Sequence, residues 1–240
     1  MNLIIDIGNT LQKIAVFNSD EMVYFNSYQI ITEDILQSVF ARFEVNYSII
    51  SSVADTDANV VDFLQSRSKL IHYTRQTKLP ITILYETPET LGLDRIASAV
   101  GAATLHPEKN VLSIQAGTCL VFDFVNEKKE YLGGSISPGL KMRFEALHGK
   151  TKKLPYINPL ISTPTILGTN TLGSLSSGVI NGLCYEIDGF IVNYKIIFKD
   201  IVVLFSGGDA NFLHNSIKNT IFAAPNVVLK GLNEIIKYNV

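Results

Sequence analysis

Short apolar runs separated by polar turns dominate the first part of the chain. Three runs joined by tight turns are typical of a β-meander. After Thr32, apolar residues recur at near-helical spacing, which predicts a helix. The predicted elements, in order, are strands at 3–7, 14–17 and 22–25, a helix after Thr32, a strand at 47–53, a helix at 59–65 and a strand at 69–73. This half therefore has the order β-β-β-α-β-α with one further strand.

The second half repeats this plan after a long helix predicted from Pro88 to just before Pro107. Its elements are strands at 111–116, 120–125 and 131–136, helices at 140–148 and 171–197, strands at 201–205 and 226–229, and a short C-terminal helix. Residues 3–10 match residues 112–118 in kind, because each is an apolar strand followed by a polar residue, Gly and Thr. We therefore predict an α/β fold of two duplicated β-β-β-α-β-α lobes with an interlobe cleft. The expected lobes are residues 1–109 and 110–240.

Composition and charge narrow the class of protein. The chain is 47% hydrophobic and 18% charged, which suits a packed globular protein. A net charge of −2 gives no basic surface for nucleic acid or an anionic membrane. The two cysteines are too few for a disulfide framework and do not have the spacing of metal ligands. The apolar runs are too short to span a bilayer. Because the first residues also lack a basic leader, we expect a cytoplasmic protein.

Residues 6–10 read Asp-Ile-Gly-Asn-Thr at a predicted strand-turn-strand junction. Glycine permits a tight turn there, and backbone N–H groups with the Thr10 hydroxyl could hold phosphate oxygens. Asp6 could hold Mg²⁺, which prefers a carboxylate, phosphate oxygens and water. An ordinary hairpin in which Asn9 tolerates positive φ is the alternative. The second copy at Gly117-Thr118 favours phosphate binding.

A glycine pair follows the predicted strand at 201–205, in the sequence Ser206-Gly207-Gly208-Asp209. Such a pair lets a flat adenosine lie against the backbone, although an ordinary β–α turn has the same composition. The chain has neither a G-x-x-x-x-G-K-[ST] nor a G-x-G-x-x-G motif, which disfavours P-loop and dinucleotide-binding folds.

Together these motifs resemble the actin, heat-shock-70 and sugar-kinase superfamily, and within it the type III pantothenate kinase family. The resemblance runs almost from end to end. It is carried by Asp6-Ile7-Gly8-Asn9-Thr10 with Lys13, Tyr85, Gly92-Leu93-Asp94-Arg95, Gly117-Thr118, residues 133–139, Leu154-Pro155, residues 168–171 and Gly207-Gly208.

The resemblance implies two ribonuclease-H-like, actin-like ATPase lobes and an activity. That activity is ATP-dependent phosphorylation of pantothenate to 4'-phosphopantothenate, the first step of coenzyme A biosynthesis. Asp94 matches the general base, and the implied pantothenate contacts are Tyr85, Gly92, Leu93, Asp94, Arg95 and Thr171. The positions implied for ATP and Mg²⁺ are Asp6, Ile7, Gly8, Asn9, Thr10, Leu11, Gln12, Lys13 and Thr118. The resemblance also implies a homodimer with the pantothenate pocket near the subunit interface.

Each of these residues also has a simpler interpretation. Asp94 and Arg95 could be a surface pair, Tyr85 a strand aromatic and Thr171 a helix cap. The chain also departs from the family at Gln115, where members usually have an Asp that binds potassium or ammonium. Val121 likewise stands where Thr is common. We therefore expect cation activation to be weak, altered or absent.

Two other functions remain open at this point. One is a kinase of the same superfamily that acts on a sugar or acetate. The other is a non-catalytic nucleotide-binding regulator. A pure binder has no use for a placed base, so Asp94 weighs against the regulator.

Overall fold

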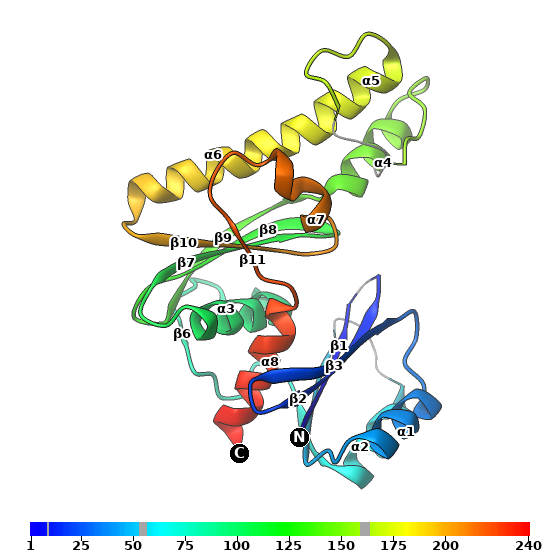
Figure 1. Ribbon diagram of the computed structural model, residues 1–240, viewed down its shortest axis with the longest axis vertical. Helices are drawn as coiled ribbons and strands as arrows, with labels where there is room; N and C mark the ends of the chain where they lie inside the picture. The colour runs from blue at the N-terminus through cyan, green and yellow to red at the C-terminus, as the bar shows by residue number, and fades with distance from the viewer. Residues whose placement is uncertain (9, 53–56, 159–163) are drawn as a thin grey trace. The chain divides into compact units, whose positions relative to one another are not determined.

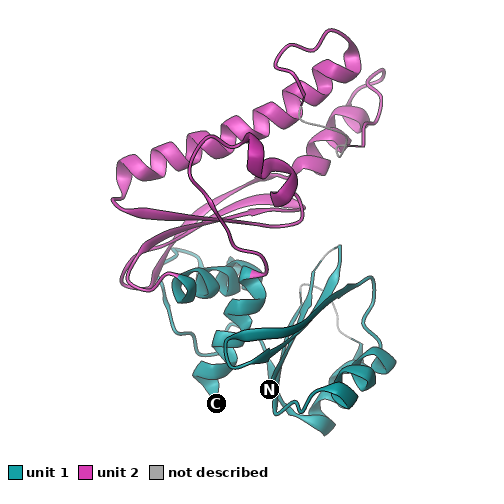
Figure 2. Ribbon diagram, viewed as in Figure 1, with its two compact units in different colours: residues 1–105, 227–240 teal, residues 106–226 magenta. Residues whose placement is uncertain are grey.

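The computed structural model describes residues 1–8, 10–52, 57–158 and 164–240. The described chain forms two compact units, residues 1–105 with 227–240 and residues 106–226 (Figure 2). The expected lobes, residues 1–109 and 110–240, place the last residues in the second lobe, whereas this division places them in the first unit. The last residues belong to the first unit because the C-terminal helix packs against a helix of that unit.

Unit 1 is built on a twisted sheet with the strand order β3-β2-β1-β4-β5. The strands are β1 (Asn2–Ile7), β2 (Gln12–Asn18), β3 (Glu21–Tyr28), β4 (Tyr47–Ser52) and β5 (Lys69–His72). The first three form the predicted antiparallel meander, and β1 pairs in parallel with β4. Unit 1 also holds the two-residue strand β6 (Thr82–Ile83).

Strand alternation divides the central strand β1 between the two faces of this sheet. Leu3, Ile5 and Ile7 belong to a buried cluster with residues of α1 (Glu33–Arg42) and α2 (Ala58–Arg67). The even-numbered residues face the other way, toward α8 (Val227–Asn239), where Asn2 donates a hydrogen bond to Asn233 at 2.8 Å. Figure 1 shows α1 and α2 on one side of the sheet and α8 on the other. Asp6 therefore lies on the α8 face.

Helices α3 (Leu93–Leu105) and α8 pack closely because glycines meet backbone where they touch. A Cβ at Gly101 would overlap the Val227 carbonyl, and a Cβ at Gly231 would overlap the Ala97 carbonyl. This contact holds α3, which begins with the predicted catalytic segment, on the face of the sheet that carries Asp6.

Unit 2 repeats the topology. Its strands lie in the order β11-β10-β7-β8-β9, so the first strand is again central between the second and the fourth. The bounds are β7 (Asn110–Ala116), β8 (Cys119–Val125), β9 (Glu130–Pro138), β10 (Ile201–Ser206) and β11 (Phe222–Ala223). As in unit 1, the first three strands are antiparallel neighbours, and the first and fourth are parallel.

The helices of unit 2 cover one face of this sheet. They are α4 (Leu140–Lys150), α5 (Thr171–Ser176), α6 (Gly182–Ile197) and α7 (Ala210–Leu213), followed by the 3₁₀ turn His214–Ser216. A π-helical turn at Ser177–Asn181 joins α5 to α6, so the predicted helix at 171–197 is continuous but wider there. Leu183, Ile187 and Ile191 of α6 belong to one buried cluster with the sheet residues Ile114 and Phe122. Figure 1 shows α6 running along one face of this sheet.

Two predicted elements are wrong. Residues 227–229, within the stretch 226–229 expected to be a strand, form the first turn of helix α8. The apolar face of this helix is buried against α3 and the sheet. The helix expected from Pro88 is a 3₁₀ turn (Pro88–Thr90), and α3 begins only at Leu93 because Leu91 has extended backbone angles. Thr32 does precede α1, but its side chain makes no capping hydrogen bond.

None of the helices in the described residues is both long and apolar enough to cross a bilayer.

The α3–α8 contact gives a stability prediction. Gly231→Ala should destabilise the protein by about 1–3 kcal/mol, because the new methyl group must push two backbones apart. Gly189→Ala, at a helical glycine with no atom within 4 Å of the added Cβ, should instead stabilise by about 0.5–1 kcal/mol. Chemical denaturation of both variants measures these two changes in the free energy of unfolding. Equal changes in the two variants would contradict the role of Gly231 in the contact between α3 and α8.

Candidate active site

Asp6 is a carboxylate placed at the end of a buried strand. In the sheet it is opposite Lys13 of β2 on one side and Ser51 of β4 on the other. Burial raises its pKa above the ordinary value, the Lys13 ammonium opposes this rise, and the charge of Asp94 adds to it. A carboxylate in such a place is stabilised by a cation.

Asp94 stands in the first turn of α3, and its side chain is exposed. Its carboxylate folds back over Gly92, where an added Cβ would lie 2.5 Å from Asp94 Oδ1. The helix starts here, since the Ile96 N–H donates to the Gly92 carbonyl at 3.1 Å. Gly92 therefore leaves the space in which the Asp94 carboxylate lies.

The negative charge of Asp94 acts on two buried groups of unit 1. The charge of Asp94 contributes to the raised pKa of Asp6 and, after burial, to the raised pKa of the Tyr73 hydroxyl. Both carboxylates belong to unit 1, one at the end of β1 and the other at the start of α3.

Arg95 is not a surface residue. It is 7% exposed, and its guanidinium carbon lies 5.9 Å from the centre of the Tyr85 ring. This arrangement is a cation–π contact, and it brings together two residues expected in the same substrate site. The simpler interpretation of Asp94 and Arg95 as a surface pair is therefore wrong for Arg95.

The remaining residues of the first hairpin have different surroundings. Ile7 is buried in the core, and the Gln12 side-chain oxygen accepts a 2.6 Å hydrogen bond from the Ile31 N–H. The Gly8 N–H donates to the Leu11 carbonyl, so it is engaged within the hairpin. Thr10 and Leu11 are exposed and Lys13 is half-buried, while Asn9 lies outside the described residues.

Unit 2 has an equivalent hairpin between β7 and β8. Gln115 occupies the place of Asp6: it pairs with Val121 on the antiparallel side and Ser206 on the parallel side, as Asp6 pairs with Lys13 and Ser51. The Gly117 N–H donates to the Cys119 carbonyl, which leaves the exposed Thr118 at the tip. The predicted internal repeat is therefore present in the strand register, and the turn between the two strands is one residue shorter in unit 2.

Two further glycine turns meet this second hairpin. The Gly139 N–H donates to the Thr118 carbonyl at 3.1 Å, and a Cβ at Gly139 would overlap the hairpin backbone. Gly207 has φ +103° and lies against Ala116, whose carbonyl accepts from the Asp209 N–H at 3.0 Å. The glycines thus let three turns pack together at the carboxyl ends of β7 and β10, where α/β folds bind ligands.

Thr171 starts helix α5, but it is not the cap. Asn170 is the cap, since its side chain accepts from the Gly173 N–H at 2.8 Å. Thr171 lines a cavity of about 930 Å³ between α4 and α5, together with Arg143, whose guanidinium is paired with Glu186. Gln115 and Thr118 do not line this cavity.

The expected residues thus fall into two groups. Asp6, Gly8, Thr10, Lys13, Tyr85 and residues 92–95 belong to unit 1, and Gln115, Thr118 and Thr171 belong to unit 2. Within the described part of the chain, no three His, Cys, Asp or Glu side chains form a metal-binding group. Mg²⁺ bound to a nucleotide needs only one or two carboxylates, because phosphates and water complete its shell. The desolvated Asp6 fits that requirement.

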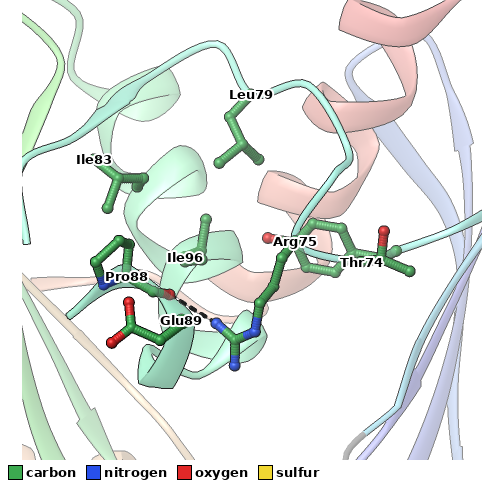
Figure 3. Close-up of a pocket in the computed structure, with 8 residues that line it drawn as sticks. Thr74, Arg75, Leu79, Ile83, Pro88, Glu89 and Ile96 are labelled. Atoms are coloured by element: carbon green, nitrogen blue, oxygen red, sulfur yellow. Dashed lines mark hydrogen bonds between the residues drawn. The ribbon is translucent and has the colours of Figure 1, made fainter.

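Sequence reasoning missed a cavity of about 290 Å³ in unit 1 (Figure 3). Its lining includes Tyr73, whose buried hydroxyl has no hydrogen-bond partner within the described residues, and Arg75. No local signal marks Arg75, because it lies in a polar stretch that reads as an ordinary turn.

Comparisons with known proteins identify a family for this chain. The family model for type III pantothenate kinase matches residues 2–193. A type III pantothenate kinase of Cytophaga hutchinsonii is 43% identical over 241 residues, which cover 100% of both chains.

Two solved structures share the fold. A Campylobacter jejuni protein assigned to the Baf family of transcriptional activators has a TM-score of 0.61 and 21% identity over 99% of this chain and 98% of that one. A Sinorhizobium meliloti protein assigned as a 2-dehydro-3-deoxygalactonokinase has a TM-score of 0.60 and 12% identity over 100% of this chain and 99% of that one. These likenesses confirm the predicted class of duplicated lobes.

The raised pKa of Asp6 gives a prediction for the ligand-free protein. Ionising this buried group disfavours the folded state; the penalty is complete above the folded pKa and disappears below the unfolded value near 3.8. Asp6→Asn should therefore raise the free energy of unfolding at pH 7, and the gain should shrink as the solution is acidified. Asp62→Asn, at an exposed carboxylate, is the matched control. Chemical denaturation of both variants between pH 7 and the unfolded pKa near 3.8 measures the two free energies of unfolding. If Asp6→Asn were less stable than wild type at pH 7, the burial argument would be wrong.

Proposed function

Because the chain belongs to the type III pantothenate kinase family, we propose that it transfers the γ-phosphoryl group of ATP to pantothenate. The product is 4'-phosphopantothenate, and the reaction is the first step of coenzyme A biosynthesis. The observation that carries the proposal is the paired placement of Asp6 and Asp94 in unit 1, within electrostatic range of each other.

Asp94 is the general base of the proposed reaction. An exposed carboxylate at the start of a helix can accept the proton of the primary hydroxyl as that oxygen attacks phosphorus. Gly92 supports this role because it leaves room for the carboxylate in its present position. In phosphoryl transfer the protein mainly positions the reactants and neutralises charge, so the placement of this one base matters.

Arg95 and Tyr85 hold the substrate or the transferring phosphate. The Arg95 guanidinium lies over the Tyr85 ring, so the two side chains are close enough to act on the same ligand. A planar guanidinium can bind two oxygens of a carboxylate or phosphate at once. Gly92, Leu93 and Thr171 are the other proposed pantothenate contacts.

The proposed ATP contacts are residues 6–13 of the first hairpin and, separately, Thr118, and Asp6 would hold the magnesium that accompanies the nucleotide. Lys13, paired with Asp6 across the sheet, and the exposed Thr10 and Thr118 are the proposed phosphate contacts. Ile7, Gly8, Leu11 and Gln12 shape the first hairpin, whose Gly8 N–H and Gln12 side chain are engaged within the protein. Magnesium supplies charge neutralisation on the phosphates when it is bound.

The dimer and the location in the cell extend the same proposal. Helix α6 exposes Tyr185, Val192, Ile196 and Ile197, and the last two are 76% and 70% exposed. Apolar side chains gathered on one helix are typical of a buried interface. We propose a cytoplasmic homodimer, and sedimentation of the purified protein measures its mass.

The direct test of the reaction uses Asp94→Asn. Wild type should release ADP from ATP and Mg²⁺ only when pantothenate is present, and the variant should lose about 10²- to 10⁴-fold in kcat. Wild type that binds ATP without pantothenate-dependent turnover would contradict the proposal. A panel of sugars and acetate would then separate another kinase from a nucleotide-binding regulator.

Gly92→Ala tests the placement of the base without removing it. The added methyl group should displace the Asp94 carboxylate rather than the backbone, and a misplacement of this kind costs about 10²-fold in kcat. Gly149→Ala is the control, since its added Cβ meets no atom within 4 Å. Circular dichroism checks that both fold. Full activity of Gly92→Ala would mean that the carboxylate position is not critical.

Gln115 gives a prediction about monovalent cations. A neutral amide can coordinate potassium through oxygen but adds no negative charge, so we expect similar turnover in potassium and sodium buffers. Gln115→Asp should introduce a potassium dependence. A strong potassium requirement in wild type would overturn this part of the proposal.

A further inference from the structure

Arg75 holds two carbonyl groups of the segment that leads to the proposed base. Its Nη1 donates to the Pro88 carbonyl at 2.8 Å and to the Leu91 carbonyl at 2.9 Å. Figure 3 shows the guanidinium reaching from its loop to Pro88 beside the cavity. These carbonyls bracket the 3₁₀ turn Pro88–Thr90, so one side chain spans the whole turn.

The loop that carries Arg75 is itself firmly held. The Thr77 N–H donates to the Thr74 carbonyl, and the Thr77 hydroxyl accepts from the Thr74 N–H at 3.0 Å. Beyond this turn, the Asn239 side chain of α8 donates to the Lys78 carbonyl at 2.9 Å. Arg75 therefore connects a braced loop to the turn before α3.

The held turn continues directly into the proposed catalytic segment. Leu91 is buried, Gly92 accepts the hydrogen bond that begins α3, and the Asp94 carboxylate lies over Gly92. Pro88 and Glu89 of the turn line the cavity of about 290 Å³, as does Arg75. The turn is therefore incompletely packed on this side, and the two hydrogen bonds from Arg75 connect it to the neighbouring loop.

We propose that Arg75 is a positioning residue that sets the place of Asp94 through the carbonyls of Pro88 and Leu91; this inference rests on the proposed function. Arg75 acts through the turn and the Gly92 backbone, so it is not a catalytic residue. The cavity gives a small cation a route to the same two carbonyls when the side chain is removed.

Two variants with different volumes test this role. Arg75→Ala and Arg75→Met both remove the donor, and each should lower kcat by about 10²-fold while the KM for ATP stays unchanged. Guanidinium ion, added far below denaturing concentrations, should restore turnover to Arg75→Ala. It should not restore Arg75→Met, whose side chain fills the vacated space, nor Asp94→Asn, which lacks the base.

Arg67→Ala is the matched control, because Arg67 is an arginine of the same unit that lies over the Phe63 ring at 5.7 Å. Its kcat should stay within about a factor of two of wild type. Wild-type activity in both Arg75 variants, or equal rescue of Arg75→Ala and Arg75→Met, would overturn the proposal.

A measurement without turnover separates this inference from the proposed function. Backbone amides of residues 88–96 should exchange with deuterium faster in Arg75→Ala than in wild type, while those of α1 should not change. If wild type shows no pantothenate-dependent turnover, the proposed function fails and the exchange data alone decide whether Arg75 holds the turn. Unchanged exchange in this segment would overturn the positioning role.

Discussion

Asp6 imposes the constraint around which unit 1 is organised. A carboxylate that loses water at the end of a buried strand favours its neutral form unless a positive charge compensates it. Lys13 compensates in part, and Asp94 works in the opposite direction. Burial and the charge of Asp94 therefore both disfavour the ionised form of Asp6, and the charge of Lys13 favours it. In the proposed reaction, the positive charge of a magnesium–nucleotide complex would offset the cost of ionising Asp6.

The rest of unit 1 keeps Asp94 in place relative to Asp6. Gly101 and Gly231 allow α3 to lie close to α8. Helix α8 in turn packs on the sheet that contains β1, the strand that carries Asp6. At its N-terminus, α3 is reached through a turn held by Arg75. The packing of α3 on α8 and the hydrogen bonds from Arg75 before its N-terminus therefore together determine where the Asp94 carboxylate lies. A reaction that depends on the position of this carboxylate depends on both.

The sequence predicts the local features well. The meander, the repeat and the polar residue at the end of each first strand follow from apolar spacing and glycine turns, and the structure places Gln115 in register as Asp6 is placed. Residues 92–95 could also be predicted as a substrate-binding segment, because the series of motifs along the chain, taken in order, is more specific than any single motif. Contacts between distant residues could not be predicted. Helix α8 packs in unit 1 because Gly101 and Gly231 let two helix backbones approach closely. Helix α3 begins late because the backbone at Leu91 is extended. The sequence around Arg75 contains no motif that predicts its hydrogen bonds to residues 88 and 91.

The most direct test of the electrostatic centre is a titration of the Asp6 carboxyl by NMR with ¹³C-labelled aspartate, in wild type and in Asp94→Asn. We expect a raised pKa for Asp6 in wild type and a lower one in the variant, because the variant removes a negative charge that acts on Asp6. The value in the variant should stay above the ordinary one, since burial is the larger cause. An Asp6 pKa that does not respond to the loss of the Asp94 charge would contradict the shared site.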